Sequence, residues 1–263
     1  MHKRETTKIV LITLGVLAVI VINAWILATS EPDILDVPES EQASEPVPDF
    51  ASFDDVKSRK AAFYDYLGPE VDKQNEYLLS LRHYLQTLQR QLTSGEELDE
   101  DDIERIDWLV DEYKISPEKS TDERLSTLMN RIDILPKELV LAQAANESAW
   151  GTSRFAQEGY NFFGLWCFRK GCGFVPSRRT KGASHEVAKF DNLSRATYTY
   201  MRNLNRHNAY SDLRDIRARL RRNQKDISGM ALAEGLMNYS QRGAAYVEEL
   251  QAMMRFNREY ISE

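Results

Sequence analysis

The fold and the chemistry of this chain are indicated most clearly by residues 142–166, which read A-Q-A-A-N-E-S-A-W-G-T-S-R-F-A-Q-E-G-Y-N-F-F-G-L-W. A helix is expected to begin at Pro136, because proline is favoured in the first turn of a helix. Val140, Ala144 and Glu147 then fall at i, i+4 and i+7 and share one helical face. Glu147 therefore ends an apolar stripe, just before a loop rich in glycine, asparagine and aromatic residues.

Glu147 is expected to have the surroundings that a general acid needs. It lies in the last turn of the predicted helix, where the helix dipole disfavours a negative charge. Burial acts in the same direction, so both effects raise the pKa of the carboxyl group. A general acid that works near neutral pH requires such a raised pKa. The alternative is a solvated glutamate at a helix end, because glutamate is almost never fully buried without a partner.

The residues around Glu147 resemble the catalytic motif of glycoside hydrolase family 73, the bacterial β-N-acetylglucosaminidases that cleave peptidoglycan. The resemblance covers residues 133–263, and it departs from many family members at Trp166, where they have lysine. The matching residues are Ala142, Ala145, Glu147, Ser148, Trp150, Gly151 and Ser153, followed by Asn161, Phe163, Gly164 and Leu165. The resemblance implies a lysozyme-like domain in which Glu147 is the catalytic acid.

A glycosidase also needs a group that handles the oxocarbenium-like centre or activates water. In the family this group is sought in the β-lobe, which is short in this chain. Glu186, just before the predicted strand 187–190, is the first candidate, and Asp191, just after it, is the second. The alternative for Glu186 is an ordinary exposed strand residue.

The family also carries a late Y-A-T-D-P-x-Y element whose first tyrosine lies in the cleft near the catalytic glutamate. Residues 239–246 of this chain read Y-S-Q-R-G-A-A-Y, so Tyr239 and Tyr246 persist, although the spacing differs by one residue and the Asp-Pro pair is absent. Tyr239 is expected to orient a water or to hydrogen-bond the sugar. The alternative is a packing tyrosine at a helix end with its hydroxyl capped.

Aromatic residues gather after Glu147, and aromatic faces stack well on sugar rings. Trp150 and Phe163 are expected to pack inside, and Tyr160 and Trp166 to lie nearer the surface. Asn161 is expected to hold the loop by hydrogen bonds from its side chain to the backbone. The substrate-binding residues predicted on this basis are Tyr160, Asn161, Phe163, Trp166 and Tyr246.

The N-terminal segment predicts a membrane location. Residues 9–29 form an uncharged apolar run that is long enough to span a bilayer. Lys3, Arg4 and Lys8 precede it, so the positive-inside rule places residues 1–8 in the cytoplasm and the C-terminal domain in the periplasm. An uncleaved signal anchor in the inner membrane is expected. A cleaved signal peptide is the alternative, against which stand the length of the run and the lack of a clear cleavage site.

The rest of the chain divides into three predicted parts. Residues 30–51 are acidic and rich in proline and serine, so a disordered linker is expected. Residues 52–132 are expected to form a helical subdomain that supports the enzyme, and residues 133–263 the catalytic domain. Packing of the first helix within the chain is favoured over a coiled-coil dimer, because its leucine repeat is short. The helices predicted from periodicity are 69–92, 101–113, 121–131, 194–206, 212–222, 228–238 and 244–260. A β-hairpin is expected from 174–176 and 187–190. The fold class is therefore mainly α, with a small β-hairpin lobe.

Composition and cysteine content narrow the chemistry further. The net charge of −7 argues against nucleic acid as a partner. Cys167 and Cys172 are expected to form a disulfide, as close pairs do in an oxidising compartment. A zinc site is the alternative, but two cysteines and a distant His185 supply too few ligands. No metal or cofactor is expected.

The activity implied by the resemblance is hydrolysis of the β-1,4 bond between N-acetylglucosamine and N-acetylmuramic acid in peptidoglycan glycan strands. Two other interpretations stay open. A lytic transglycosylase would use the same glutamate without an activated water and needs no second carboxylate. A wall-binding module without catalytic activity would bind the strands and leave them intact.

Overall fold

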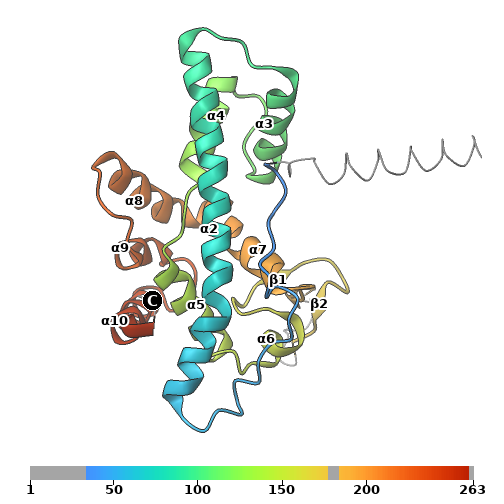
Figure 1. Cartoon of the computed structure of the whole chain (residues 1–263), viewed down its shortest axis with the longest axis vertical. Coiled ribbons are helices and arrows are strands. Elements are labelled where there is room, and N and C mark those ends of the chain that lie inside the picture. Colours follow the sequence, from blue (N-terminus) through green and yellow to red (C-terminus); the bar gives the residue numbers. More distant parts are fainter. Residues whose placement is uncertain (1–33, 177–183, 261–263) are drawn as a thin grey trace, which may run out of the picture. The chain divides into compact units, whose positions relative to one another are not determined.

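Helix α2, Val56–Ser94, is the longest helix of the described residues and packs against α4, α5 and α7 (Figure 1). The computed structural model describes residues 34–176 and 184–260, and residues 37–263 form one compact unit. The other helices are α3 Glu100–Glu112, α4 Thr121–Arg131, α5 Lys137–Ser148, α6 Arg154–Gly159, α7 Leu193–Arg206, α8 Ser211–Arg222, α9 Gly229–Ala233 and α10 Ala244–Phe256. Short 3-10 turns complete the set: η1 Asn208–Tyr210, η2 Glu234–Leu236 and η3 Arg258–Tyr260.

Helix α2 begins well before the position predicted for it. Its N-cap is Asp55, whose side chain accepts a hydrogen bond from the backbone N–H of Ser58, and it ends at Gly95, where φ is 84°. Pro69, predicted as the start, lies inside the helix. Proline removes a backbone donor and is normally a helix breaker. Here the turns on both sides bury one apolar face, as Phe63, Leu67 and Val71 show, and this packing offsets the cost of the lost hydrogen bond.

The boundary predicted near residue 132 does not separate two domains. Helix α2 packs against α4 and also against α5 and α7, which belong to the predicted catalytic part. The ring of Phe63 meets Trp150 at 5.5 Å and Phe162 at 6.1 Å between centroids. The N-terminal helices and the catalytic helices therefore share one hydrophobic core.

The linker predicted over residues 30–51 is packed from residue 37 onward, so the expectation of disorder is wrong for that part. Ala43 and Phe50 are buried, and the backbone N–H of Leu193 donates to the carbonyl of Ala43 at 3.0 Å. The Phe50 ring lies against Phe63, with 5.6 Å between centroids, and against Gly151. Disorder was predicted because the segment is polar overall, although Ala43 and Phe50 are buried and hold it against the helices.

The β-lobe is a three-stranded antiparallel sheet rather than a simple hairpin. Its strands are β1 Trp166–Cys167, β2 Gly173–Phe174 and β3 Glu186–Ala188, in the order β1-β3-β2. The predicted pairing of the second and third strands is confirmed, with Phe174 opposite Val187. Strand β1 was not predicted, because a strand of two residues is too short to show an alternation of apolar and polar residues.

The described residues include no helix that is both long and apolar enough to cross a membrane. The predicted cytoplasmic tail, residues 1–8, and the predicted transmembrane anchor, residues 9–29, lie outside the described part of the chain.

A buried ion-pair cluster ties helices α2 and α8 to the segment between α4 and α5. Asp133, which is 2% exposed, accepts two hydrogen bonds from Arg221 at 3.0 and 2.6 Å. Arg82 of α2 lies 3.5 Å from the same carboxylate and Arg217 of α8 lies 4.0 Å from it. Burial by itself would raise the pKa of Asp133, but the three arginines outweigh it and the pKa is lowered. The cluster fixes the segment that leads into α5, the helix that carries Glu147.

Candidate active site

A pocket of about 580 Å³ opens at the C-terminal end of α5. One wall comes from the loop and strands of the β-lobe, and the other comes from the end of α7 and the turn η1. Glu147 and Tyr239 also line the pocket. The lining residues are Glu147, Phe163, Gly164, Leu165, Trp166, Cys167, Phe168, Ala188, Phe190, Thr199, Asn203, Arg206, His207, Tyr210 and Tyr239.

The position of Glu147 is fixed by the turn that ends helix α5 directly after it. Ala149 has a left-handed backbone conformation, with φ of 52°, which stops α5. The hydroxyl of Ser148 donates to the carbonyl of Ala144 at 2.6 Å and accepts from the backbone N–H of Gly151 at 2.8 Å. These bonds hold the turn, so Glu147 opens into the pocket from a fixed backbone.

The pKa of Glu147 is raised, as the sequence predicted. The residue is exposed toward the pocket, yet the protein around its carboxyl group removes enough water for desolvation to be the largest cause of the shift. The hydrogen bond from Tyr246 lowers the pKa, Glu249 raises it and Arg242 lowers it. The protonated form that a general acid needs therefore persists to a higher pH than in a solvated glutamate.

A directional hydrogen-bond chain orients the Glu147 carboxyl group. The hydroxyl of Tyr246 donates to Glu147 Oε1 at 3.0 Å, and Gln143 Nε2 donates to the Tyr246 oxygen at 3.0 Å. The hydroxyl of Tyr200 donates to Gln143 Oε1. Gln143, Tyr200 and Tyr246 are buried. Because the Tyr246 oxygen accepts a hydrogen bond from Gln143, its own O–H is directed at Glu147.

The second oxygen of Glu147 lies on the side of the aromatic loop. A Cβ atom added to Gly164 would sit 3.3 Å from Glu147 Oε2, and Gly164 has a φ of 64°. Any side chain at this position would be strained and would crowd that oxygen. The glycine therefore keeps open the space in front of Oε2, the oxygen that Tyr246 leaves free.

Tyr239 lies in the pocket wall, but its hydroxyl has a structural partner. It donates to the carbonyl of Phe163 at 2.9 Å, and its ring stacks on Tyr246 with 5.5 Å between centroids. Burial raises its pKa well above the ordinary value for tyrosine. Tyr239 thus connects the aromatic loop to Tyr246, the residue that hydrogen-bonds Glu147. Its hydroxyl has a backbone partner, as expected for the alternative in which Tyr239 is a packing residue.

Asn161 holds the loop, as predicted. Its side-chain amide donates to the carbonyls of Leu165 at 2.9 Å and Ala188 at 2.8 Å, and its oxygen accepts from the backbone N–H of Leu165 at 3.0 Å. The residue is buried and does not line the pocket. Its predicted contact with substrate is therefore not supported by its position.

The predicted aromatic residues divide between pocket and scaffold. Phe163 and Trp166 both line the pocket. Phe163 is otherwise buried and stacks on Tyr200 with 4.0 Å between centroids, whereas Trp166 is 50% exposed. Tyr160 lies outside the pocket, where its hydroxyl donates to the carbonyl of Glu45 at 3.2 Å. Trp150 is half-buried rather than fully inside.

Neither candidate for the second carboxylate lines the pocket. Glu186 is buried, and its two oxygens accept from the backbone N–H groups of Gly171 at 3.0 Å and Gly173 at 2.9 Å. Asp191 is exposed outside the lining. Glu147 is the one carboxylate among the described residues that line the pocket.

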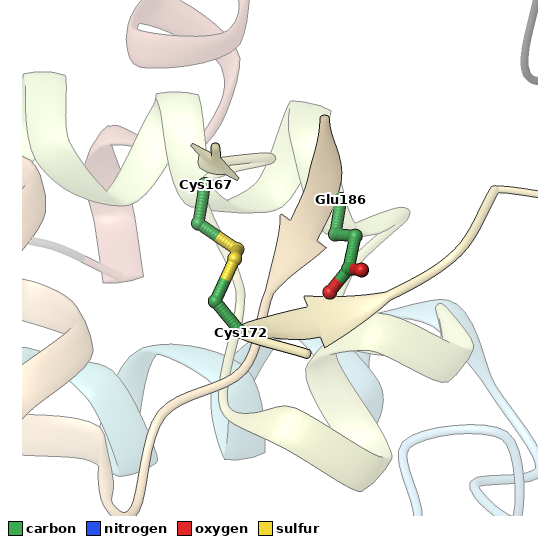
Figure 2. Close-up of side chains that lie close together, drawn as sticks. All are labelled: Cys167, Cys172 and Glu186. Carbon is green, nitrogen blue, oxygen red and sulfur yellow. A yellow bond between two sulfur atoms is a disulfide. The ribbon is translucent and has the colours of Figure 1, made fainter. Parts of the chain in front are cut away.

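Cys167 and Cys172 form the predicted disulfide. Figure 2 shows the bridge beside Glu186 in the sheet, and the sulfur and carboxylate atoms lie within 4.8 Å of one another. Such a group of side chains could suit a metal ion, but the two sulfurs are bonded to each other and offer no thiolate ligands.

Several residues of the site carry no clear signal in the sequence. Gln143 lies one turn before Glu147 on the same face, which is the only local hint of its role. Tyr246 belonged to the predicted set, but its bond to Glu147 joins residues 99 positions apart. Phe168 is an aromatic residue inside the disulfide loop and was not predicted to line the pocket.

A mainly helical fold whose pocket holds a carboxyl group of raised pKa beside aromatic residues is compatible with a glycoside hydrolase. Comparison with known proteins agrees with this class. Residues 123–259, just over half of the chain, match the Glucosaminidase family, described as mannosyl-glycoprotein endo-β-N-acetylglucosaminidase. The chain belongs to this family of glycoside hydrolases.

The chain is also similar to Protein Bax of Escherichia coli strain K12. The two are 31% identical over 222 residues, which cover 83% of this chain and 77% of that relative. No solved structure matches the chain.

Proposed function

We propose that this chain is a peptidoglycan hydrolase that cleaves the β-1,4 bond between N-acetylglucosamine and N-acetylmuramic acid. The observation that carries the proposal is the state of Glu147 in its pocket. Tyr246 holds one oxygen of the carboxyl group, the other oxygen faces open space beside Gly164, and the pKa is raised. Glu147 would give its proton from Oε2 to the leaving glycosidic oxygen.

The chain of hydrogen bonds behind Glu147 suits the charge that then develops. Once Glu147 has lost its proton, the carboxylate keeps the hydrogen bond from Tyr246, and a hydrogen bond to a charged acceptor is stronger than one to a neutral acceptor. Gln143 and Tyr200 hold the Tyr246 hydroxyl in the required direction. The network therefore favours the product of proton transfer without reorganisation.

The second half of the reaction proceeds without a protein carboxylate in this proposal. Glu186 and Asp191 do not line the pocket, and residues 177–183, outside the described part of the lobe, contain no acidic residue. A water molecule or the acetamido group of the substrate would attack the oxocarbenium-like centre. The second of these routes is the one that substrate-assisted glycosidases use. This replaces the catalytic role first considered for Glu186.

The same observation favours a second candidate, a lytic transglycosylase. In that reaction the sugar closes its own hydroxyl onto the anomeric carbon and releases an anhydro sugar, so no water is consumed. Digestion of purified sacculi followed by mass analysis of the product ends separates the two. Hydrolysis predicts reducing ends, with the identity of the terminal sugar giving the bond. Anhydro ends would contradict hydrolysis, and intact strands that retain bound protein would show a wall-binding module.

We further propose that residues 9–29 anchor the chain in the inner membrane with the enzyme in the periplasm. Support comes from the uncharged run after Lys3, Arg4 and Lys8 and from the disulfide, a bond typical of oxidising compartments. A reporter that is active only in the cytoplasm, fused to the C-terminus, should give no signal. A strong signal would contradict this topology.

A further inference from the structure

The disulfide loop, residues 167–172, is fixed to the sheet at three points. Cys167 and Cys172 close it covalently, and Cys167 pairs with Glu186 across the sheet. The carboxylate of Glu186 accepts the backbone N–H groups of Gly171 and Gly173, the residues on either side of Cys172. Figure 2 shows the disulfide between Cys167 and Cys172 and, close to it, the side chain of Glu186. The loop therefore has very little conformational freedom.

This rigid loop and the residue before it present two large aromatic side chains to the pocket. Phe168, directly after Cys167, is 78% exposed and lines the pocket. Trp166, directly before Cys167, is 50% exposed and also lines it. Leaving so much apolar surface in water costs free energy, which is recovered when a ligand covers it.

We infer that the disulfide loop is a preformed platform for a pyranose ring of the glycan strand, with Phe168 as the stacking residue. In this assignment, which rests on the proposed function, Glu186 is a positioning residue that acts through Phe168. The ligand class is an N-acetylated glycan, whose sugar rings have apolar faces and whose acetamido groups carry methyl groups. Such a ligand covers the exposed aromatic carbons while its hydroxyls stay in water.

The geometry of Glu186 supports a positioning role over a catalytic one. Both oxygens are already used by backbone N–H groups, and the side chain is 4% exposed. A catalytic carboxylate needs an oxygen that reaches the reacting atoms or a water beside them. The same two hydrogen bonds are what a rigid loop needs, because ordering a flexible loop on binding would reduce affinity.

Kinetics on a soluble tetrasaccharide of alternating N-acetylglucosamine and N-acetylmuramic acid test this assignment. Phe168→Ala should raise KM roughly tenfold, about 1.4 kcal/mol, and leave kcat within about twofold. Phe168→Trp should keep the original KM. Glu186→Gln should raise KM in the same way, and adding it to Phe168→Ala should give little further loss, because the two residues act through one contact. Val175→Ala, at an exposed residue of the same lobe outside the pocket, should change nothing.

Two results would overturn the platform. One is an unchanged KM in Phe168→Ala, and the other is a loss of kcat of about a hundredfold or more in Glu186→Gln at unchanged KM, which would make Glu186 a catalytic carboxylate. Thermal melts of each variant identify any that fail to fold. If Glu186→Gln unfolds, Phe168→Ala still tests the platform, because Phe168 is exposed and its substitution should not affect folding.

A binding experiment separates the platform from the proposed reaction. In the Glu147→Gln background, calorimetric titration with a hexasaccharide of N-acetylglucosamine should show binding that Phe168→Ala weakens roughly tenfold. This result would support the platform even if the native enzyme cleaved no peptidoglycan, which would contradict the proposed function alone. Absence of binding in both proteins would overturn the platform.

Discussion

At the scale of single residues, the proposed mechanism depends on the different surroundings of the two carboxyl oxygens of Glu147. One accepts a hydrogen bond from Tyr246, and the other faces the space that Gly164 keeps open. Glu147 itself and its raised pKa were predictable from the sequence, because helix position and apolar periodicity are local properties. The bond from Tyr246 was not predictable, because it depends on how α10 packs against α5.

Substitution of Tyr246 tests this arrangement through the pH dependence of the rate. The hydrogen bond from Tyr246 stabilises ionised Glu147 and so lowers its pKa. Tyr246→Phe removes that bond, so the pKa of Glu147 should rise further. In the proposed mechanism catalysis needs protonated Glu147, so the rate falls as pH rises through this pKa. The basic limb of kcat/KM should therefore move to higher pH. On the acidic side of that limb, kcat/KM should fall roughly tenfold, because one oriented hydrogen bond is lost.

Tyr239→Phe is the matched control for this measurement. Its hydroxyl donates to the carbonyl of Phe163 and makes no hydrogen bond to Glu147. The basic limb should therefore keep its position in Tyr239→Phe. A limb that stays fixed or moves to lower pH in Tyr246→Phe would contradict the role given to Tyr246.

At the scale of elements, the sequence predicted helices well where local signals agree. Helix α4 has the predicted bounds Thr121–Arg131, and a capping box of Ser120 and Glu123 marks its start. The start of α2 was missed because Pro69 is a strong local signal that tertiary packing overrides. The sheet could be predicted only in part, because the register that places Glu186 opposite Cys167 depends on contacts between distant strands.

The buried cluster around Asp133 should be essential for the position of α5. Asp133→Asn would leave Arg217, which is fully buried, without its anionic partner, and the loss of one partner of a buried pair costs about 3–5 kcal/mol. Urea unfolding near neutral pH should show this loss. Asp111→Asn, which removes an exposed pair with Lys114, should change stability by less than about 1 kcal/mol.

The pH dependence of the same pair gives a second readout. The pKa of Asp133 is lowered in the folded protein, so its contribution is complete above its unfolded pKa of about 3.9. The contribution is lost as pH falls through the lower folded pKa. The difference between native protein and Asp133→Asn should therefore shrink below about pH 4. Equal stability of the two proteins at neutral pH would contradict the structural role of the cluster.

At the scale of the whole molecule, the N-terminal helices are part of the enzyme's core. Composition suggested a linker at 30–51 and a separate subdomain at 52–132, because neither segment carries catalytic residues. The structure shows that Phe63 packs against Trp150, close to the end of α5, and that Phe50 packs against Phe63. Which helices share a core cannot be predicted from the periodicity of each helix alone.

Residues 133–263 alone are therefore expected not to fold cooperatively, whereas residues 37–263 should. Removing α2 would expose the faces of α5 and α7 that pack against it. Circular dichroism during thermal unfolding of the two proteins provides the measurement. A cooperative transition and full activity in residues 133–263 would show that the predicted boundary is a real domain boundary.

The most direct test of the central claim is the activity of Glu147→Gln on purified sacculi. The glutamine keeps the shape of the side chain but cannot donate the acidic proton, so cleavage should fall by about a thousandfold or more while the melting temperature stays near that of the native protein. Glu158→Gln, at an exposed residue of α6 outside the pocket, should keep native activity. Native rates of cleavage by folded Glu147→Gln would contradict the assignment of Glu147 as the catalytic acid.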